Sequence, residues 1–235
     1  MREESREQAD AWWRVLLGVG DELWSEVTVQ HPHGRLGGYE GWYVAWREAG
    51  VHISAPSSAA ADEVASLAGQ PGRELQQPAF WHAFARQRGL EVRGPSLHAY
   101  LDVDPGPSDR VTTAASVDDL ADLEAEVDPA DWEESGFADR PPLVFVVAEG
   151  GQQVAASNLN VLDGIPRDIG VLVAPHARGR GLAAEVGRHA ASYAIRDSGL
   201  ARWAARIGNE PSTRTAHRLG FEPYVTQLGL RPPPR

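Results

Sequence analysis

The sequence predicts an α/β fold with a mixed sheet, in which a smaller α/β half precedes the main domain. Three observations support this prediction. Apolar strand-like runs alternate with alanine-rich helical segments along the 235 residues. The stretch "PPLVFVVAEGGQQVAASNLNVL" is typical of two strands joined by a Gly-Gly turn. The stretch "RDIGVLVAP" is a strand apolar enough to be central in a sheet, and a long helix follows it.

The composition is that of a globular protein, with 42% hydrophobic and 23% charged residues. No apolar run approaches the roughly 18 residues that a bilayer span needs, and the N-terminus does not resemble a secretion signal. The chain has no cysteine, which excludes disulfides, thiol nucleophiles and thiolate metal sites. We therefore expect a cytoplasmic protein with no membrane partner.

The charge pattern narrows the ligand classes. A net charge of −11 argues against a nucleic-acid partner and is compatible with amine-bearing ligands, although surface acidity also serves solubility. All 22 basic residues are arginine, which excludes a catalytic lysine and a Walker-type phosphate loop. The eight histidines show no metal-ligand spacing, so no metal is expected.

The Pro-, Gly- and Asp-rich stretch "VDPGPSDR" at 103–110 is the predicted domain boundary, which gives domains 1–105 and 110–235. In the second domain, a helix capped by Ser116 comes first. The strand pair around Glu149-Gly150-Gly151 and the strand 167–175 follow. The remaining predicted elements are a helix from Gly181 to about Asp197, a strand at 201–209, a helix at 210–220 and a strand at 223–231.

In the first half we expect helices at 9–24, 58–69 and 78–89, a strand pair turning at Ala49-Gly50, and a strand at 96–103. "VHISAP" echoes "VLVAP", so this half is either a degenerate copy of the second or similar by chance. Six of the eight tryptophans lie here, as packed core or as an aromatic acceptor wall, with core preferred: Trp12, Trp13, Trp24, Trp42, Trp46 and Trp81.

The turn Arg178-Gly179-Arg180-Gly181 lies where the central strand gives way to the long helix. Helix N-termini attract anions through their unpaired N–H groups, and glycine lets a phosphate approach those amides. Arginine adds bidentate donors suited to phosphate oxygens. The turn therefore predicts a pyrophosphate cradle, against the alternative of a plain turn with solvated arginines.

Two phosphate-binding patterns compete for this turn. Gly179-x-Gly181-x-x-Ala184 formally satisfies the dinucleotide fingerprint, but residues intervene after the strand and the next strand ends at Asn209 without an acidic residue. The run from Arg178 to Ala183 fits better, because it resembles the Arg/Gln-x-x-Gly-x-Gly/Ala acyl-CoA loop of the GNAT superfamily of N-acyltransferases. That loop follows a strand ending in V-x-P, as Val173-Ala174-Pro175 does. "IGNEPSTRTAHRLGFEPY" resembles the final motif of the family, and the resemblance covers about 110–230.

The resemblance implies roles for particular residues, with acetyl-CoA as co-substrate. Val171, Leu172 and Val173 would offer backbone groups to the pantetheine arm. The pyrophosphate would be cradled by six consecutive residues: Arg178, Gly179, Arg180, Gly181, Leu182 and Ala183. Asn209 and Ser212 would contact the cofactor where the two central strands splay.

The chemistry is less defined, because the tyrosine that many relatives use as thiolate acid is replaced here by Ala216. Tyr224 is a candidate acid or a packed strand aromatic, and His217 a surface residue or a catalytic one. Asp168 is the candidate general base, as the carboxylate nearest the acyl-binding strand, or a solvated strand-start residue.

Four further residues are candidates for the acceptor side: Glu133, Glu134, Ser157 and Asn158. The predicted function is transfer of acetyl from acetyl-CoA to a primary amine of a small molecule or peptide, by a monomer or homodimer. The alternatives are an inert acyl-CoA sensor or scaffold and, more distantly, a dinucleotide-dependent enzyme.

Overall fold

The structure is a computed structural model that describes residues 1–31, 35–36, 39–114, 116–162 and 165–233. The chain divides into two compact units, each described here by itself. The C-terminal unit comprises Met1–Arg2, Ala99–Ala205 and Asn209–Pro223. The N-terminal unit comprises Glu3–His98, Arg206–Gly208 and Tyr224–Arg235. The division near Ala99 lies before the expected boundary at 105–110, and most of the last strand belongs with the N-terminal unit.

The N-terminal unit has strands in the order β1-β3-β2-β10-β4, with β1 parallel to β3 and β2 antiparallel to both β3 and β10. Its strands are β1 (Val27–Gln30), β2 (Trp42–Arg47), β3 (Gly50–Ser54), most of β4 (Glu91–Leu101) and most of β10 (Glu222–Arg231). Its helices are α1 (Glu3–Leu17), α2 (Ser58–Glu63), the 3-10 helix η1 (Ala65–Gly69), α3 (Gly72–Leu75) and α4 (Pro78–Arg88).

Aromatic side chains fill the core of the N-terminal unit, as expected from the tryptophan count. Trp13 and Trp81 are fully buried, and Trp81 Nε1 donates to the Leu75 carbonyl, which satisfies its one polar atom. Three more tryptophans are buried: Trp24, Trp42 and Trp46. The packing role is therefore confirmed for these five residues.

The C-terminal unit has strands in the order β9-β8-β7-β6-β5. These are β5 (Thr112–Thr113), β6 (Leu143–Glu149), β7 (Gln152–Leu162), β8 (Ile165–Val173) and β9 (Ala201–Arg206), and only β8 and β9 pair in parallel among them. The helices are the 3-10 helix η2 (Val117–Leu120), α5 (Ala121–Glu126), α6 (Pro129–Glu134), the 3-10 helix η3 (Pro175–Ala177), α7 (Leu182–Ser198) and α8 (Glu210–Leu219). The mixed α/β fold is confirmed.

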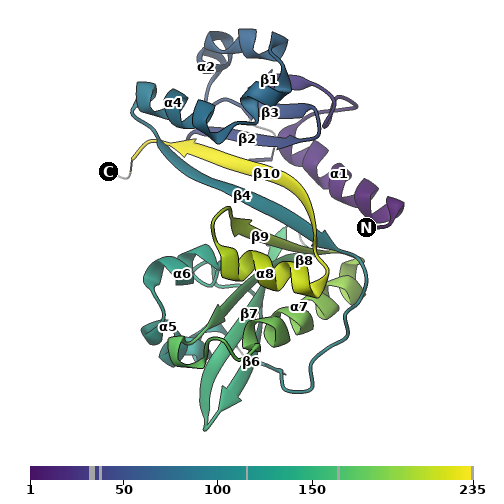
Figure 1. The fold of residues 1–235 in the computed structure, drawn as a ribbon, viewed down its shortest axis with the longest axis vertical. Coiled ribbons are helices and arrows are strands. Elements are labelled where there is room, and N and C mark those ends of the chain that lie inside the picture. The colour runs from purple at the N-terminus through teal and green to yellow at the C-terminus, as the bar shows by residue number, and fades with distance from the viewer. Residues whose placement is uncertain (32–34, 37–38, 115, 163–164, 234–235) are drawn as a thin grey trace. The chain divides into compact units, whose positions relative to one another are not determined.

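Two adjacent residues of β7 show which helices cover which face of this sheet. Ser157 Oγ donates to the Val186 carbonyl on α7, whereas Asn158 Nδ2 donates to the Ser135 carbonyl at the end of α6. Because successive strand side chains point to opposite faces, α7 and α6 cover opposite faces. Trp203 on β9 lies near Gly187 of α7 and bonds Ser212 of α8, so α8 shares the face of α7 (Figure 1).

Local chemistry explains the element boundaries that the sequence predicts. Gly150 and Gly151 both have positive φ, at 59° and 87°, as a tight hairpin turn between β6 and β7 requires. Ser116 forms a capping box with Asp119 at the start of η2. Left-handed glycines end α7 at Gly199 and α8 at Gly220.

The N-terminal unit matches its expected elements less closely. The helix predicted at 9–24 is α1, which starts at Glu3 and stops at Leu17 before the left-handed Gly18. The strand–Ala-Pro–helix order of β3 and α2 resembles that of β8 and α7. However, the parallel neighbour of β3 is β1, which precedes it, whereas the parallel neighbour of β8 is β9, which follows α7. The crossover of the C-terminal unit is thus not repeated, and a degenerate duplication is not confirmed.

Candidate acyl-CoA site

The C-terminal half of β8 presents an open edge. β8 pairs with β7 as far as Val173, but its register with β9 consists of Asp168↔Arg202 and Ile169↔Trp203. The Ala174 N–H donates to the Val154 carbonyl on the β7 side. Since backbone groups alternate along a strand, those of Val171 and Val173 face the edge that β9 leaves. The splay expected between the two central strands is present, and it exposes main-chain donors and acceptors.

The turn after β8 is built by two left-handed glycines. Gly179 has φ 77° and Gly181 has φ 80°, and a Cβ at either position would meet only open space. The glycines are therefore required by the backbone conformation and not by crowding. Gly181 is the N-cap of α7 and provides no side-chain cap, so the first N–H groups of this 17-residue helix keep their capacity for an anion. Leu182 is buried and anchors the helix start, and Ala183 follows in the first turn.

Both arginines of the turn are held by carboxylates. Arg178 contacts Asp131 of α6 at 3.3 Å and donates through Nε to the Val173 carbonyl at 3.3 Å. Arg180 contacts Glu149 at the end of β6 at 2.8 Å. The two arginine side chains are 53% and 49% exposed, and ion pairs this exposed contribute little. A phosphate group could replace either carboxylate. Both partners are distant along the chain from the turn, so no local sequence pattern indicates them.

Asn209 and Ser212 lie at the start of α8. The Asn209 side chain caps the helix by accepting from the Ser212 N–H at 3.2 Å. Ser212 Oγ in turn accepts from Trp203 Nε1 at 2.9 Å. Asn209 thus caps α8, and Ser212 ties α8 to β9 at Trp203, next to the point where β9 leaves β8.

Asp168 is one of the two β8 residues in register with β9, one position before the last pair, Ile169↔Trp203. Its side chain is 23% exposed and Oδ1 is 3.3 Å from Nε of Arg202, its register partner on β9. Burial raises the pKa of the Asp168 carboxyl, and the Arg202 guanidinium opposes that rise. Arg202 is buried within an apolar strand, a position where arginine is rare unless a carboxylate pairs with it.

Tyr224 belongs to the N-terminal unit, where its hydroxyl is already engaged. The hydroxyl donates to Asp10 Oδ1 at 2.7 Å, and the Arg47 guanidinium stacks over the ring. Burial raises the pKa of Tyr224, and the bond to Asp10 raises it further. Ala216, at the position where many relatives carry tyrosine, is buried on α8, and His217 beside it is exposed.

The acceptor-side candidates lie on α6 and β7. Glu133 and Glu134 are exposed at the end of α6, and Asn209 Nδ2 lies 3.5 Å from Glu134 Oε1. Ser157 and Asn158 are both fully buried. Asn158 bonds to the end of α6, whereas Ser157 bonds to α7 on the opposite face of the sheet and so lies away from the other three acceptor-side candidates. α6 therefore lies beside both β8 and the start of α8.

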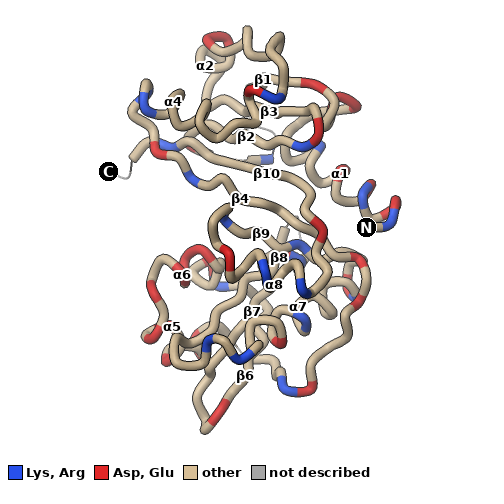
Figure 2. Tube along the Cα trace, in the orientation of Figure 1, with Lys and Arg blue, Asp and Glu red and all other residues tan. Residues whose placement is uncertain are grey.

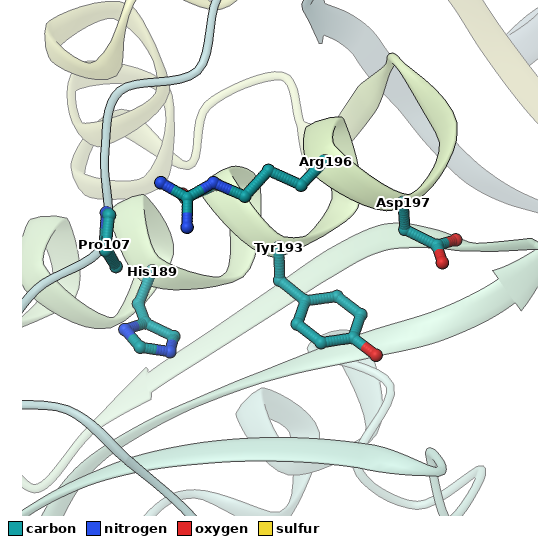
Figure 3. A pocket seen from close by; sticks show the side chains of 6 residues that line it. Pro107, His189, Tyr193, Arg196 and Asp197 are labelled. Carbon is teal, nitrogen blue, oxygen red and sulfur yellow. The ribbon is translucent and has the colours of Figure 1, made fainter.

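A shallow pocket of about 420 Å³ lies elsewhere, along the second half of α7. It is lined by Pro107, His189, Ser192, Tyr193, Arg196 and Asp197, and Figure 3 shows Arg196 extending along the helix toward Pro107. Tyr193 is 11 residues beyond Leu182, about 16 Å along the helix, so this pocket is separate from the arginine–glycine turn.

Two properties concern the described residues as a whole. The described residues contain no group of three or more His, Cys, Asp or Glu side chains placed to hold a metal ion. Within the same part of the chain, no helix is both long enough and apolar enough to cross a bilayer.

Several solved structures are similar to this chain at low identity. A GNAT-family protein from Novosphingobium aromaticivorans is 20% identical with a TM-score of 0.47, covering 60% of this chain and 66% of its own. An acetyltransferase of the GNAT family from Colwellia psychrerythraea is 16% identical with a TM-score of 0.47, covering 64% and 60%. A Drosophila protein is 14% identical with a TM-score of 0.49, covering 85% and 78%. The chain thus spans less than two thirds of the length of the first two.

None of the curated proteins is similar enough to the chain to count as a relative. The acetyltransferase (GNAT) family model matches residues 112–221. That range contains the open edge of β8, the arginine–glycine turn, α7 and the Asn209 cap of α8. Residues 112–221 therefore form an acetyltransferase domain of the GNAT family.

Proposed function

We propose that this protein is an N-acetyltransferase that moves an acetyl group from acetyl-CoA to a primary amine of a small molecule or peptide. One observation carries the proposal: the open edge of β8 is followed, after the three-residue helix η3, by the arginine–glycine turn at the start of α7. An extended arm with amide groups would add to the strand edge, and a diphosphate would follow at the turn. A ligand with both parts in this order is an acyl-CoA.

In the proposed reaction the amine nitrogen attacks the thioester carbonyl carbon. A carbon–nitrogen bond forms, the carbon–sulfur bond breaks, and coenzyme A leaves as a thiolate with the bonding electrons. Asp168 accepts the proton of the amine directly or through water, and solvent protonates the thiolate. The N–H groups of Val171 and Val173 supply donors for the oxygen that becomes negative in the transition state.

The charge around α5 and α6 supports an amine as the acceptor. Residues 111–139 contain ten Asp and Glu and no basic residue, and acidic positions recur along both helices (Figure 2). A primary amine is mostly protonated at neutral pH, so a negative potential beside β8 raises its local concentration. The proposal assumes a cytoplasmic enzyme that works as a monomer or homodimer.

Two measurements test the proposal. Calorimetric titration should show binding of acetyl-CoA and no binding of NAD. Release of coenzyme A should then rise with at least one member of a panel of polyamines, amino acids, aminoglycosides and lysine-containing peptides. Binding without turnover for the whole panel would favour the inert sensor, and binding of NAD alone would favour a dinucleotide enzyme.

A further inference from the structure

The amide of Asn158 joins three parts of the C-terminal unit. Asn158 lies on β7 and is fully buried. Its Oδ1 accepts from the Gly170 N–H on β8 at 2.9 Å, and its Nδ2 donates to the Ser135 carbonyl, just beyond α6, at 3.0 Å. A backbone N–H only donates and a carbonyl only accepts, so the two partners fix the orientation of the amide. One side chain therefore ties the start of the open edge to the end of α6.

Gly170 shows how closely these parts approach. A Cβ at this position would lie 1.8 Å from the Ser135 carbonyl oxygen, which no side chain could tolerate without moving α6 or β8. Gly170 is also the first residue of β8 beyond its register with β9. The glycine allows the contact, and Asn158 holds it with two hydrogen bonds in a site that excludes water.

We propose that Asn158 is a positioning residue for acyl transfer, which sets α6 and its acidic end against the open edge of β8. This inference rests on the proposed function, since α6 matters to the reaction only if the acceptor amine approaches on that side. Among the described residues, the side chain of Asn158 forms hydrogen bonds with Ser135, Asn160 and Gly170, none of which belongs to the arginine–glycine turn. Its loss should consequently affect the acceptor and leave the binding of acetyl-CoA nearly unchanged.

Ser157 offers a matched control on the same strand. It is also fully buried, and its Oγ donates to a backbone carbonyl, that of Val186, at 2.8 Å. The difference is the face, because this bond reaches α7 and not the end of α6. Ser157→Ala therefore removes a buried hydrogen bond of the same kind without releasing α6.

The experiment compares Asn158→Ala, Asn158→Asp and Ser157→Ala with the unmodified protein. Asn158→Asp, when ionised, keeps an acceptor for the Gly170 N–H but has no donor for Ser135, so above the pKa of the new carboxyl it tests the α6 bond even if Asn158→Ala does not fold. Hydrogen exchange over residues 129–136, where the first exchanging amide is that of Ala130, reports the docking of α6. Calorimetry gives the Kd of acetyl-CoA, and coenzyme A release gives kcat and the acceptor KM.

Both Asn158 variants should raise exchange at 129–136 and lower kcat/KM for the amine by about tenfold, as expected for one buried hydrogen bond. The Kd of acetyl-CoA should change by less than about threefold, which is under 0.7 kcal/mol. Ser157→Ala should lower the Tm without either acceptor effect.

Three results would overturn the inference: unchanged exchange at 129–136, unchanged acceptor kinetics with increased exchange, or equal acceptor effects from Ser157→Ala. If the unmodified protein releases no coenzyme A with any amine, the proposed function fails on that result alone. The exchange measurement still decides in that case whether Asn158 fixes α6.

Discussion

At Asp168, burial and an arginine act in opposite directions on one carboxyl group. Burial raises its pKa and Arg202 at 3.3 Å opposes the rise, so the carboxylate is a stronger base than that of an exposed aspartate. Asp168→Asn removes the base. We expect kcat to fall by about 10²–10⁴ at neutral pH and by less at high pH, where the amine deprotonates without help.

Tyr224→Phe is the contrasting variant. The Tyr224 hydroxyl donates to Asp10, so its loss should cost stability, about 1 kcal/mol, and change kcat little. The check is a pH profile of kcat for both variants beside their denaturant curves. Full activity in Asp168→Asn with loss of activity in Tyr224→Phe would mean that the protein supplies the acid and not the base.

His52 makes the stability of the N-terminal unit depend on pH. It is fully buried, its Nε2 accepts the Trp24 N–H, and its Nδ1 lies 2.6 Å from Thr28 Oγ1, so the ring is neutral with the proton on Nδ1. Burial lowers the pKa of His52 to about 4, against a partial rise from Glu22. In the unfolded chain His52 is protonated below about pH 6.5, whereas in the folded chain it stays neutral down to about pH 4. The free energy of unfolding therefore falls as the pH falls from about 6.5 towards 4.

This difference in the pKa of His52 between the folded and unfolded chain predicts that the free energy of unfolding falls by about 2 kcal/mol between pH 7 and pH 5. The variant His52→Gln keeps an acceptor and a donor but does not titrate. The carboxylates contribute equally to the pH dependence of the unmodified protein and of His52→Gln. Urea unfolding of both proteins at pH 7 and pH 5 therefore measures the contribution of His52 alone. Equal losses in the two proteins would show that His52 does not cause the pH dependence.

At the scale of the elements, two substitutions of Gly181 at the start of α7 separate the effect of backbone strain on cofactor binding from the effect of added charge. Both Gly181→Ala and Gly181→Glu place a Cβ at φ 80°, so both should lose about 1–2 kcal/mol of stability. Only the glutamate adds a negative charge where the diphosphate would bind. We expect Gly181→Glu to abolish binding of acetyl-CoA and Gly181→Ala to weaken it modestly, as measured by calorimetry. The same affinity in both variants would remove the turn from the binding site.

The sequence predicts best those elements that start or end at a residue type typical of a cap or a turn. Glycines end α7 and α8, Ser116 starts η2, and a Gly-Gly turn joins β6 to β7, so each could be placed from residue type alone. β1 and β5 have no such boundary: they are four and two residues long and owe their form to a neighbouring strand.

The candidate site follows the same rule. The arginine–glycine turn and the Asn209 cap are contiguous in sequence and could be identified there. Arg202, Asp131 and Glu149 act through contacts between distant segments, and no local pattern indicates such pairs. The role of Asn158 likewise depends on three elements that meet only in the folded unit.

On the scale of the whole molecule, the division of the chain depends on strand pairing. A Pro- and Gly-rich stretch at 103–110 predicts a boundary there, but residues 99–101 at the end of β4 already belong to the C-terminal unit. The strand at 222–231 follows the last helix of the C-terminal unit, yet from Tyr224 onward it belongs to the other unit, where 226–230 pair with β2. Order along the chain does not determine which sheet a final strand joins.

The last prediction concerns how many cofactor molecules one chain binds. The N-terminal unit has a strand followed by Ala-Pro and a helix, as the C-terminal unit does, but α2 is six residues long and the Ser57 side chain caps it by accepting from the Ala60 N–H. Residues 57–62 include neither glycine nor arginine, so this helix start lacks both the open amides and the cations of the turn before α7.

Calorimetric titration should therefore give one acetyl-CoA per chain, and Gly181→Glu should remove that single binding event entirely. The variant matters because a second, weaker site could be hidden under the first in the unmodified protein. A stoichiometry of two, or binding that persists in Gly181→Glu while the same variant stays folded, would place a cofactor site in the N-terminal unit and contradict the assignment of binding to the turn before α7 alone.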